Sequence, residues 1–305
     1  MLRLLLVRLV QIPAIIIAMS LLVFIFLNAS GDPAQLLMPT EATEQDIEEM
    51  RRALGLDRPL HVQYWNFLSN ALQGDFGTSL RSRQPAMDTV LAALPATLEL
   101  AFAAIIISTA VSIPLGIAAA VKRNSPIDTI ATVVAVLGQS MPVFWLGILL
   151  ILLFSVTLNW LPVSGRGSWQ SLILPAVTLG WYMNALMTRL TRSAMVEVLN
   201  EPYIRTARAK GMPLRTIIFK HAFRNARIPI LTIWGLQVGT MLTGTVVTET
   251  VFAWPGLGRA SIHAVVGRDF PVVMASIALF TLIFVLINLI VDLAYYALDP
   301  RIRKV

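Results

Sequence analysis

Long apolar segments separated by shorter polar ones dominate the chain. The apolar segments cover approximately residues 9–27, 96–121, 127–156, 172–195, 228–250 and 272–298. Each is long enough to cross a bilayer as a helix, which rises about 1.5 Å per residue. The pattern therefore predicts an all-α polytopic membrane protein with six transmembrane helices.

The first apolar segment has an alternative interpretation as a cleaved signal peptide, because Arg3 and Arg8 precede it. It is longer than the apolar core of a signal peptide, and no clear small-residue cleavage motif follows it. We therefore interpret it as an uncleaved membrane helix.

A polar segment at 30–95 predicts a water-exposed insertion after the first span. Thr43 and Asp46 have the spacing of a capping box, and Gly55 marks the end of the helix that follows. A second helix is expected from Leu60 to Gln73, with Gly74 as its stop. We expect its apolar side chains to face inward: Val62, Trp65, Leu68 and Leu72. The predicted domains are the first helix (1–29), the insertion (30–95) and a five-helix core (96–305).

Composition supports the membrane assignment and excludes several functions. Of the 305 residues, 56% are hydrophobic and 13% charged, and the mean hydropathy is +0.73, which excludes a soluble enzyme. The net charge of +7 does not predict nucleic-acid binding, because the basic residues flank apolar segments. There is no cysteine, and the three histidines lack metal-ligand spacing, so no metal site is predicted.

The distribution of basic residues predicts the topology. Two thirds of the 24 Lys and Arg residues lie on the side shared by the two termini and the loop at 196–229. By the positive-inside rule this side is cytoplasmic, which places the 30–95 insertion outside the cytoplasm.

The basic loop at 196–229 has the pattern of a helix, a turn and a second helix. Asn200 is the expected N-cap, Pro202 suits the first helical turn, and Gly211 can adopt the left-handed conformation before Pro213 starts the next helix. The expected apolar stripes are Ile204 with Ala207, and Leu214 with Ile217, Ile218 and Ala222. On composition alone, this loop could also be a topology signal without further function.

The residues of this loop resemble the cytoplasmic coupling loop of ABC-importer permeases, in the form found in the dipeptide, oligopeptide, nickel and glutathione group. The matching run is TARAKG at 206–211. Tyr203 precedes it, and His221 and the tripeptide Arg224-Asn225-Ala226 follow it. Arg205 stands where the wider family has glutamate, which favours the peptide group. The resemblance implies contact with an ATPase for Glu201, Tyr203, Arg205, Thr206, Ala207, Arg208, Lys210, Gly211, His221, Arg224 and Asn225.

Other segments resemble the same group: GDFGTSLR from Gly74, WPGLGR from Trp254, and the run from Asp299 to Arg301. The first two lie opposite the basic loops in the predicted topology. They suggest docking of an extracytoplasmic binding protein through Asp75, Phe76, Arg81, Trp254 and Arg259.

The chain has no G-x-x-x-x-G-K-[ST] run, so it is not expected to hydrolyse ATP or to be an enzyme. The resemblance implies a prokaryotic inner-membrane permease with both termini in the cytoplasm. Its expected partners are a homologous second permease, giving a heterodimer, two ATP-binding subunits that carry ATP and magnesium, a solute-binding protein and membrane lipid. The chain itself is expected to bind no cofactor and no nucleic acid.

Polar residues within the predicted spans are candidates for a translocation pathway for peptides or a related small solute. They are Gln139, Ser140, Asn184, Gln237 and Thr240. Helix packing is the alternative role for each of them. A second class of function is an ion-driven transporter or channel, but the acidic candidates Glu99, Glu249 and Asp292 lie near span ends. The substrate stays open among dipeptides, oligopeptides, glutathione and nickel complexes.

Overall fold

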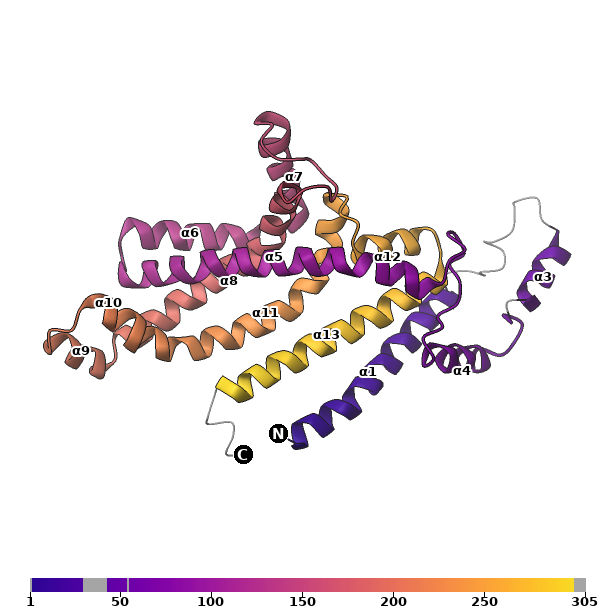
Figure 1. The fold of residues 1–305 in the computed structure, drawn as a ribbon, viewed down its shortest axis with the longest axis horizontal. Coiled ribbons are helices and arrows are strands. Elements are labelled where there is room, and N and C mark those ends of the chain that lie inside the picture. Colours follow the sequence, from indigo (N-terminus) through magenta and orange to yellow (C-terminus); the bar gives the residue numbers. More distant parts are fainter. Residues whose placement is uncertain (1, 30–42, 54, 299–305) are drawn as a thin grey trace. The chain divides into compact units, whose positions relative to one another are not determined.

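The computed structural model describes residues 2–29, 43–53 and 55–298, and these residues are mostly helical (Figure 1). An isolated bridge pairs Thr78 with Pro85. The elements in chain order are α1 (Leu2–Ala29), α3 (Glu44–Ala53), α4 (Leu60–Ala71), α5 (Ala86–Val121), α6 (Pro126–Ser140), α7 (Val143–Leu150), the π-helix η1 (Ile151–Thr157), α8 (Gln170–Leu199), α9 (Pro202–Ala209), α10 (Leu214–Thr216), the π-helix η2 (Ile217–Ala222), α11 (Phe223–Val251), α12 (Leu257–Val266) and α13 (Phe270–Leu298).

The chain forms two compact units. One comprises Met1–Thr97 and Pro255–Leu286, and the other comprises Leu98–Trp254 and Ile287–Val305. Helices α5 and α13 each contribute residues to both units.

The first unit has its own hydrophobic core, built from the start of α5, α12 and the first half of α13. Its buried residues include Val90, Leu257 and Val273, and Phe76 and Val23 pack against them. The hydroxyl of Thr97, itself buried, accepts a 2.7 Å hydrogen bond from the backbone N–H of Leu257. The WPGLGR segment thus leads directly into a core helix.

The predicted capping box at α3 is confirmed. The hydroxyl and backbone N–H of Thr43 both donate to the Asp46 carboxylate, at 2.7 and 3.0 Å, and these bonds hold the pKa of Asp46 below its ordinary value. Because the folded-state pKa is lowered, this contribution to helix stability is present above the unfolded-state pKa and is lost as the pH falls. Gly55 ends the helix at φ +68°, as expected.

The second helix of the insertion, α4, orients its side chains differently from the prediction. Trp65 is 69% exposed and Leu72 is 82% exposed, so the expectation that they face inward is wrong. Tyr64 and Phe67 form the packing side of α4 instead: the Tyr64 ring lies 5.5 Å from that of Phe24 in α1, and Phe67 lies 6.0 Å from Phe76. The helical spacing of apolar residues does not show which face packs on the protein, because the face with Trp65 and Leu72 and the face with Tyr64 and Phe67 are both apolar.

The carboxylate of Asp269 fixes the end of the insertion. It accepts hydrogen bonds from the Ser79 hydroxyl at 2.5 Å and from the backbone N–H groups of Leu80 and Arg81 at 3.1 and 3.4 Å. Ser79 and Asp269 are 3% and 4% exposed. The sequence analysis missed this contact, which joins the GDFGTSLR segment to the turn before α13.

The predicted spans are confirmed only in part. Within the described residues, two helices are long and apolar enough to cross a membrane, in α5 and α13, and up to four if each of two bent pairs forms one span. The third predicted span, 127–156, is not one continuous helix, because α6 and the α7–η1 helix meet at 111°. Pro142 accounts for this break, since it follows the last residues of α6 and disfavours helix at Met141, whose φ and ψ are −86° and 127°. Helix α5 begins at Ala86, ten residues before its predicted span.

The second unit is organised around α8, which packs against α6, α7 and α11 (Figure 1). Helix α5 also approaches α8 closely, at Gly116. A Cβ atom placed there would lie 2.6 Å from the Thr191 Cβ and 2.8 Å from the Thr188 carbonyl oxygen. Small residues of this kind let two membrane helices pack backbone to backbone.

We expect Gly116→Ala to destabilise the protein by about 1–3 kcal/mol, because the added methyl group must push α5 away from the α8 backbone. The measurement is the midpoint of thermal unfolding of the purified protein in detergent. Gly167→Ala is the matched control, since nothing lies within 4 Å of a Cβ atom there. Equal midpoints for the two variants would contradict this prediction.

Candidate coupling surface

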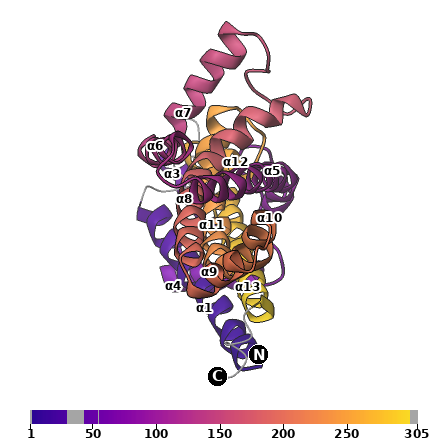
Figure 2. The same cartoon turned by 90° about the vertical axis from the view of Figure 1, so that its left-hand side faces the viewer.

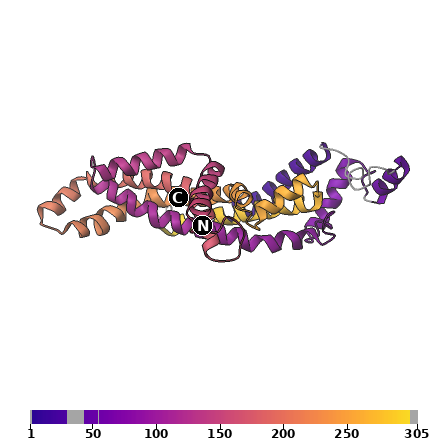
Figure 3. The same ribbon diagram turned by 90° about the horizontal axis from the view of Figure 1, so that it is seen from above.

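The basic loop forms a hairpin of α9 and the helix that starts at α10, and this hairpin projects at one end of the second unit (Figure 3). Figure 2 views the same end with α9 and α10 facing the reader. Helix α9 has Pro202 at its first position, as expected. The N-cap is Glu201, so the prediction of Asn200 is wrong. Asn200 is αR, and its side-chain amide donates to the Val196 carbonyl oxygen at the end of α8.

The turn after α9 depends on Gly211, which has φ +72° as predicted. Its N–H donates to the Arg208 carbonyl at 2.9 Å, and the N–H of Met212 donates to the Ala207 carbonyl at 3.3 Å. This pair of bonds is a Schellman motif, which ends a helix with a left-handed residue and satisfies its last carbonyls. The turn between the two arms of the hairpin therefore requires a left-handed residue at position 211.

The second arm differs from the short amphipathic helix that was predicted. Helix α10 continues through η2 into α11, so the arm forms the start of a much longer helix. Ile217, Ile218 and Ala222 are buried as expected, but Leu214 is 56% exposed and does not belong to this stripe. On α9, Ile204 is fully buried, which fixes the first arm against the second unit.

Most of the predicted coupling residues lie on the surface of the hairpin. All eleven are exposed except Ala207, which is buried, and His221, which is half-buried. Exposed apolar side chains accompany the basic ones: Tyr203, Leu214 and Phe219 are 40%, 56% and 56% exposed. A surface that combines cations with large apolar side chains is typical of a protein–protein interface.

The structure brings together five residues of this surface in an open groove of about 460 Å³: Tyr203, Lys220, His221, Arg224 and Asn225. The Asn225 amide donates a 2.7 Å hydrogen bond to the Tyr203 hydroxyl, which ties α9 to the base of α11. Among the described residues, the buried Nε2 of His221 has no hydrogen-bond partner. The cations beside the groove can bind a carboxylate from a partner protein.

An ion pair that the sequence analysis missed joins α6 to α8 in the same unit as the hairpin. Arg192 of α8 donates through Nε and Nη2 to the two carboxylate oxygens of Asp128 in α6, and the Nη2 bond is 2.8 Å long. The backbone N–H of Asn124 donates to the same carboxylate at 2.9 Å. Asp128 is 4% exposed, so the pair joins α6 to α8 in a largely buried setting.

The polar residues proposed for a translocation pathway lie on three helices. Asn184 of α8 borders a cavity of about 20 Å³ together with Trp181. Gln139 is close to this region, because a Cβ atom at the neighbouring Gly138 would lie 2.8 Å from the Ala185 Cβ. Ser140 sits at the break after α6, where its hydroxyl donates to the Val136 carbonyl. Gln237 and Thr240 lie on α11, and the Thr240 hydroxyl donates to the Gln237 carbonyl.

The residues proposed for binding-protein docking differ in exposure. Asp75 and Arg81 are exposed, and Arg259 is half-buried. Phe76 packs on the core of the first unit, and Trp254 is only 1% exposed. Of these five candidates, only the polar residues Asp75 and Arg81 are exposed. The run from Asp299 to Arg301 lies outside the described residues.

Two family models cover most of the chain. The binding-protein-dependent transport system inner membrane component family matches residues 112–304, and the N-terminal family of the same transport system matches residues 1–101. The chain belongs to this family of ABC importer permeases. The resemblance inferred from the coupling loop is thereby confirmed. Within the described residues, no group of three or more His, Cys, Asp or Glu side chains could hold a metal ion.

Curated relatives share nearly half of the residues over nearly the full length. The glutathione transport system permease protein GsiC of Salmonella typhimurium strain LT2 is 47% identical over 304 residues, which are 99% of each chain. GsiC of Escherichia coli strain K12 is 48% identical over 293 residues, or 96% of this chain and 95% of the relative.

Solved structures show the same fold at low sequence identity. The inward-facing MetNI methionine ABC transporter matches with a TM-score of 0.61 at 19% identity, covering 70% of this chain and 97% of that one. An amino acid ABC transporter matches with a TM-score of 0.54 at 17% identity, covering 69% and 94%. The permease fold is therefore shared well beyond the close relatives.

Proposed function

We propose that this permease forms part of the translocation pathway of an ATP-driven importer for glutathione or another short peptide. The full-length similarity to glutathione transport permeases supports this substrate class. The observation that carries the ATP-driven mechanism is the hairpin at Gly211, whose exposed cations and apolar side chains suit a groove on an ATPase subunit.

In the proposed assembly, the chain pairs with a homologous permease as a heterodimer. Two ATP-binding subunits bind the hairpins on the cytoplasmic side, and a solute-binding protein delivers substrate from the opposite side. The hairpin acts as a rigid lever, because its first arm is anchored by buried Ile204 and its second arm continues into α11. Closure of the ATPases would then move α11 as a body and switch access to the pathway.

The test is uptake of radiolabelled glutathione by the complex reconstituted in liposomes with its solute-binding protein. We expect uptake to require ATP inside the liposomes and to persist when a protonophore and a sodium ionophore remove ion gradients. Labelled dipeptides in parallel would identify the preferred substrate within the class. Uptake driven by an ion gradient without ATP would instead favour a secondary transporter and overturn the proposal.

A further inference from the structure

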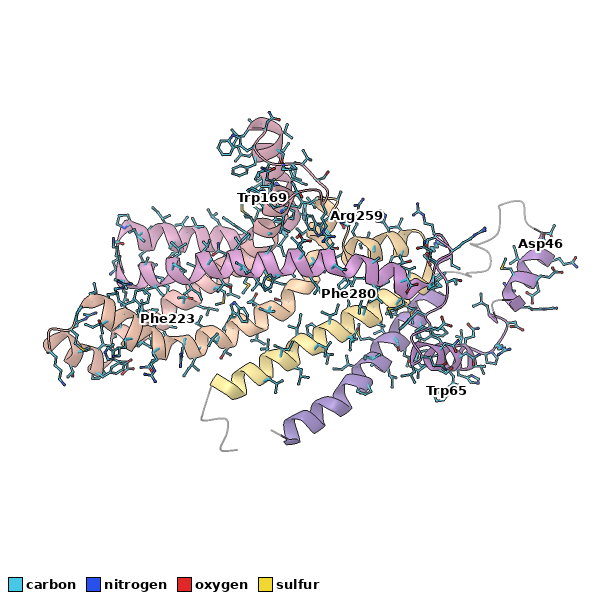
Figure 4. All side chains as sticks on the ribbon, viewed as in Figure 1. Asp46, Trp65, Trp169, Phe223, Arg259 and Phe280 are labelled. Carbon is cyan, nitrogen blue, oxygen red and sulfur yellow. The ribbon has the colours of Figure 1, made fainter. Side chains whose placement is uncertain are left out.

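Helix α4 presents an exposed apolar surface. Within the part of the chain that the structure describes, no other residue covers it. The helix contains no charged side chain in the twelve residues from Leu60 to Ala71. The polar side chains Asn66 and Asn70 lie on one side, while Trp65 and, just beyond the helix end, Leu72 are largely exposed on another, where the exposed His61 precedes them at the start of the helix. Figure 4 shows Trp65 on this helix.

An apolar groove of about 360 Å³ adjoins this surface. Helices α1, α4 and α13 and the first turn of α5 border it. The lining side chains that matter here are Ile16, Leu68, Leu72, Met87, Leu279 and Leu282. Leu72 thus belongs both to the exposed surface of α4 and to the wall of the groove.

The position of α4 along α1 indicates what this surface meets. The Tyr64 hydroxyl donates to the Ile17 carbonyl oxygen at 3.0 Å and lies 2.9 Å from the Ser20 hydroxyl. At about 1.5 Å per residue, Ile17 lies about 23 Å from the Leu2 end of α1 and about 18 Å from the Ala29 end.

The hydrocarbon core of a bilayer is about 30 Å thick, whereas α1 is about 42 Å long. If α1 crosses the bilayer, Ile17 lies within the hydrocarbon wherever that layer is placed along the helix. Tyr64 therefore holds α4 at membrane depth. This step rests on the proposed function, because it requires α1 to be a membrane span.

The side of α1 away from the groove is also apolar and exposed. Ile15, Leu22 and Ile25 are 40%, 48% and 56% exposed, so α1 presents apolar side chains to its surroundings as well as to the groove lined by Ile16. An uncharged amphipathic helix with a tryptophan at its edge is suited to the boundary between headgroups and acyl chains.

We infer that α4 is an interfacial helix embedded in the lipid bilayer, with Trp65 and Leu72 facing acyl chains and one lipid chain lying in the adjoining groove. The insertion after the first span is then partly a membrane-embedded structure. Only its polar segments remain available for a protein partner.

Because this chain has no cysteine, single-cysteine variants of it can carry nitroxide labels in a complex assembled with partner subunits that have been made cysteine-free. Trp65→Cys and Leu72→Cys report on the apolar surface, and Asn66→Cys and Asn70→Cys are matched controls on the polar side of the same helix. The complexes are placed in vesicles of phosphatidylethanolamine and phosphatidylglycerol. Collisions with oxygen, which concentrates in hydrocarbon, are compared with collisions with a water-soluble nickel chelate.

We expect labels at 65 and 72 to favour oxygen several-fold over the nickel chelate, relative to labels at 66 and 70. Equal nickel accessibility at all four positions would overturn the inference. Labels at 65 and 72 that are shielded from both reagents only after the solute-binding protein is added would also overturn it, and would assign the surface to that protein. ATP-driven uptake by the same vesicles tests the proposed function separately.

A second measurement keeps the native side chains. Brominated acyl chains quench tryptophans that contact lipid. We expect wild-type protein to show more quenching than Trp65→Phe, which keeps an aromatic ring at this position. Identical quenching of the two proteins would contradict lipid contact at Trp65.

Discussion

Arg192→Met should destabilise the protein by about 3 kcal/mol, because it leaves the buried carboxylate of Asp128 without its ionic partner. The backbone N–H of Asn124 would still donate a hydrogen bond to that charge, but the two-pronged contact would be lost. The measurements are the midpoint of thermal unfolding in detergent and the yield of monodisperse protein. Arg189→Met is the matched control, since Arg189 is exposed on the same helix.

The double variant Asp128→Leu/Arg192→Met should recover most of that loss. Replacement of a buried ion pair by apolar side chains is often neutral, whereas removal of one partner is costly. The stability of Arg192→Lys should lie between those of Arg192→Met and the double variant. A lysine keeps the positive charge, but its ammonium group cannot reproduce the two-pronged contact of the guanidinium with both carboxylate oxygens. If Arg192→Met is as stable as Arg189→Met, then the contact does not join α6 to α8 as the structure indicates.

Local features of the hairpin could be predicted from the sequence. The positive φ of Gly211, the position of Pro202 and the burial of Ile204 and Ala207 all follow from short-range chemistry. The N-cap of α9 could not be predicted, because the Asn200 side chain can bind the backbone either at the start of α9 or at the end of α8. In the structure it donates to the Val196 carbonyl oxygen at the end of α8. The length of the second arm was missed since Leu214 and the residues after it suit either a short or a continuous helix.

Contacts between distant segments were beyond sequence reasoning. Ser79 and Asp269 are 190 residues apart, and Asp128 and Arg192 are 64 residues apart. Each residue alone is compatible with an ordinary surface position, and only the fold shows the pairing. The first pair lies within one compact unit and the second within the other, and no periodicity or motif spacing encodes either pair.

The apolar face of α4 shows a related limit. Apolar side chains at helical spacing indicate burial, but they do not distinguish protein from lipid as the surroundings. The expectation that Trp65 and Leu72 face inward assumed a water-exposed insertion with a protein core. The contact between Tyr64 and the middle of α1 removes that assumption, because it relates the helix to a predicted membrane span.

Gly211→Val should reduce binding of the ATPase subunits or uncouple ATP hydrolysis from uptake, with a loss of about tenfold or more. A branched side chain at φ +72° carries a strain of about 1–3 kcal/mol, so the turn will relax to another angle when the hairpin is free. Restoring the docked angle then costs that free energy at each binding event, and about 1.4 kcal/mol corresponds to a factor of ten. No atom outside the turn lies within 4 Å of the new Cβ, so packing elsewhere stays intact.

The measurements are ATPase co-purification and ATP-driven uptake at matched expression. Gly55→Val is a control for strain alone, because Gly55 has φ +68° and equally open surroundings but lies in the insertion. Arg215→Gln is a control for the surface charge of the hairpin, since one exposed charge contributes little to a packed interface. Normal uptake by Gly211→Val would mean that the hairpin angle does not transmit ATPase motion. The basic loop would then be only a topology signal, and the coupling role proposed for the residues from Glu201 to Gly211 would be wrong.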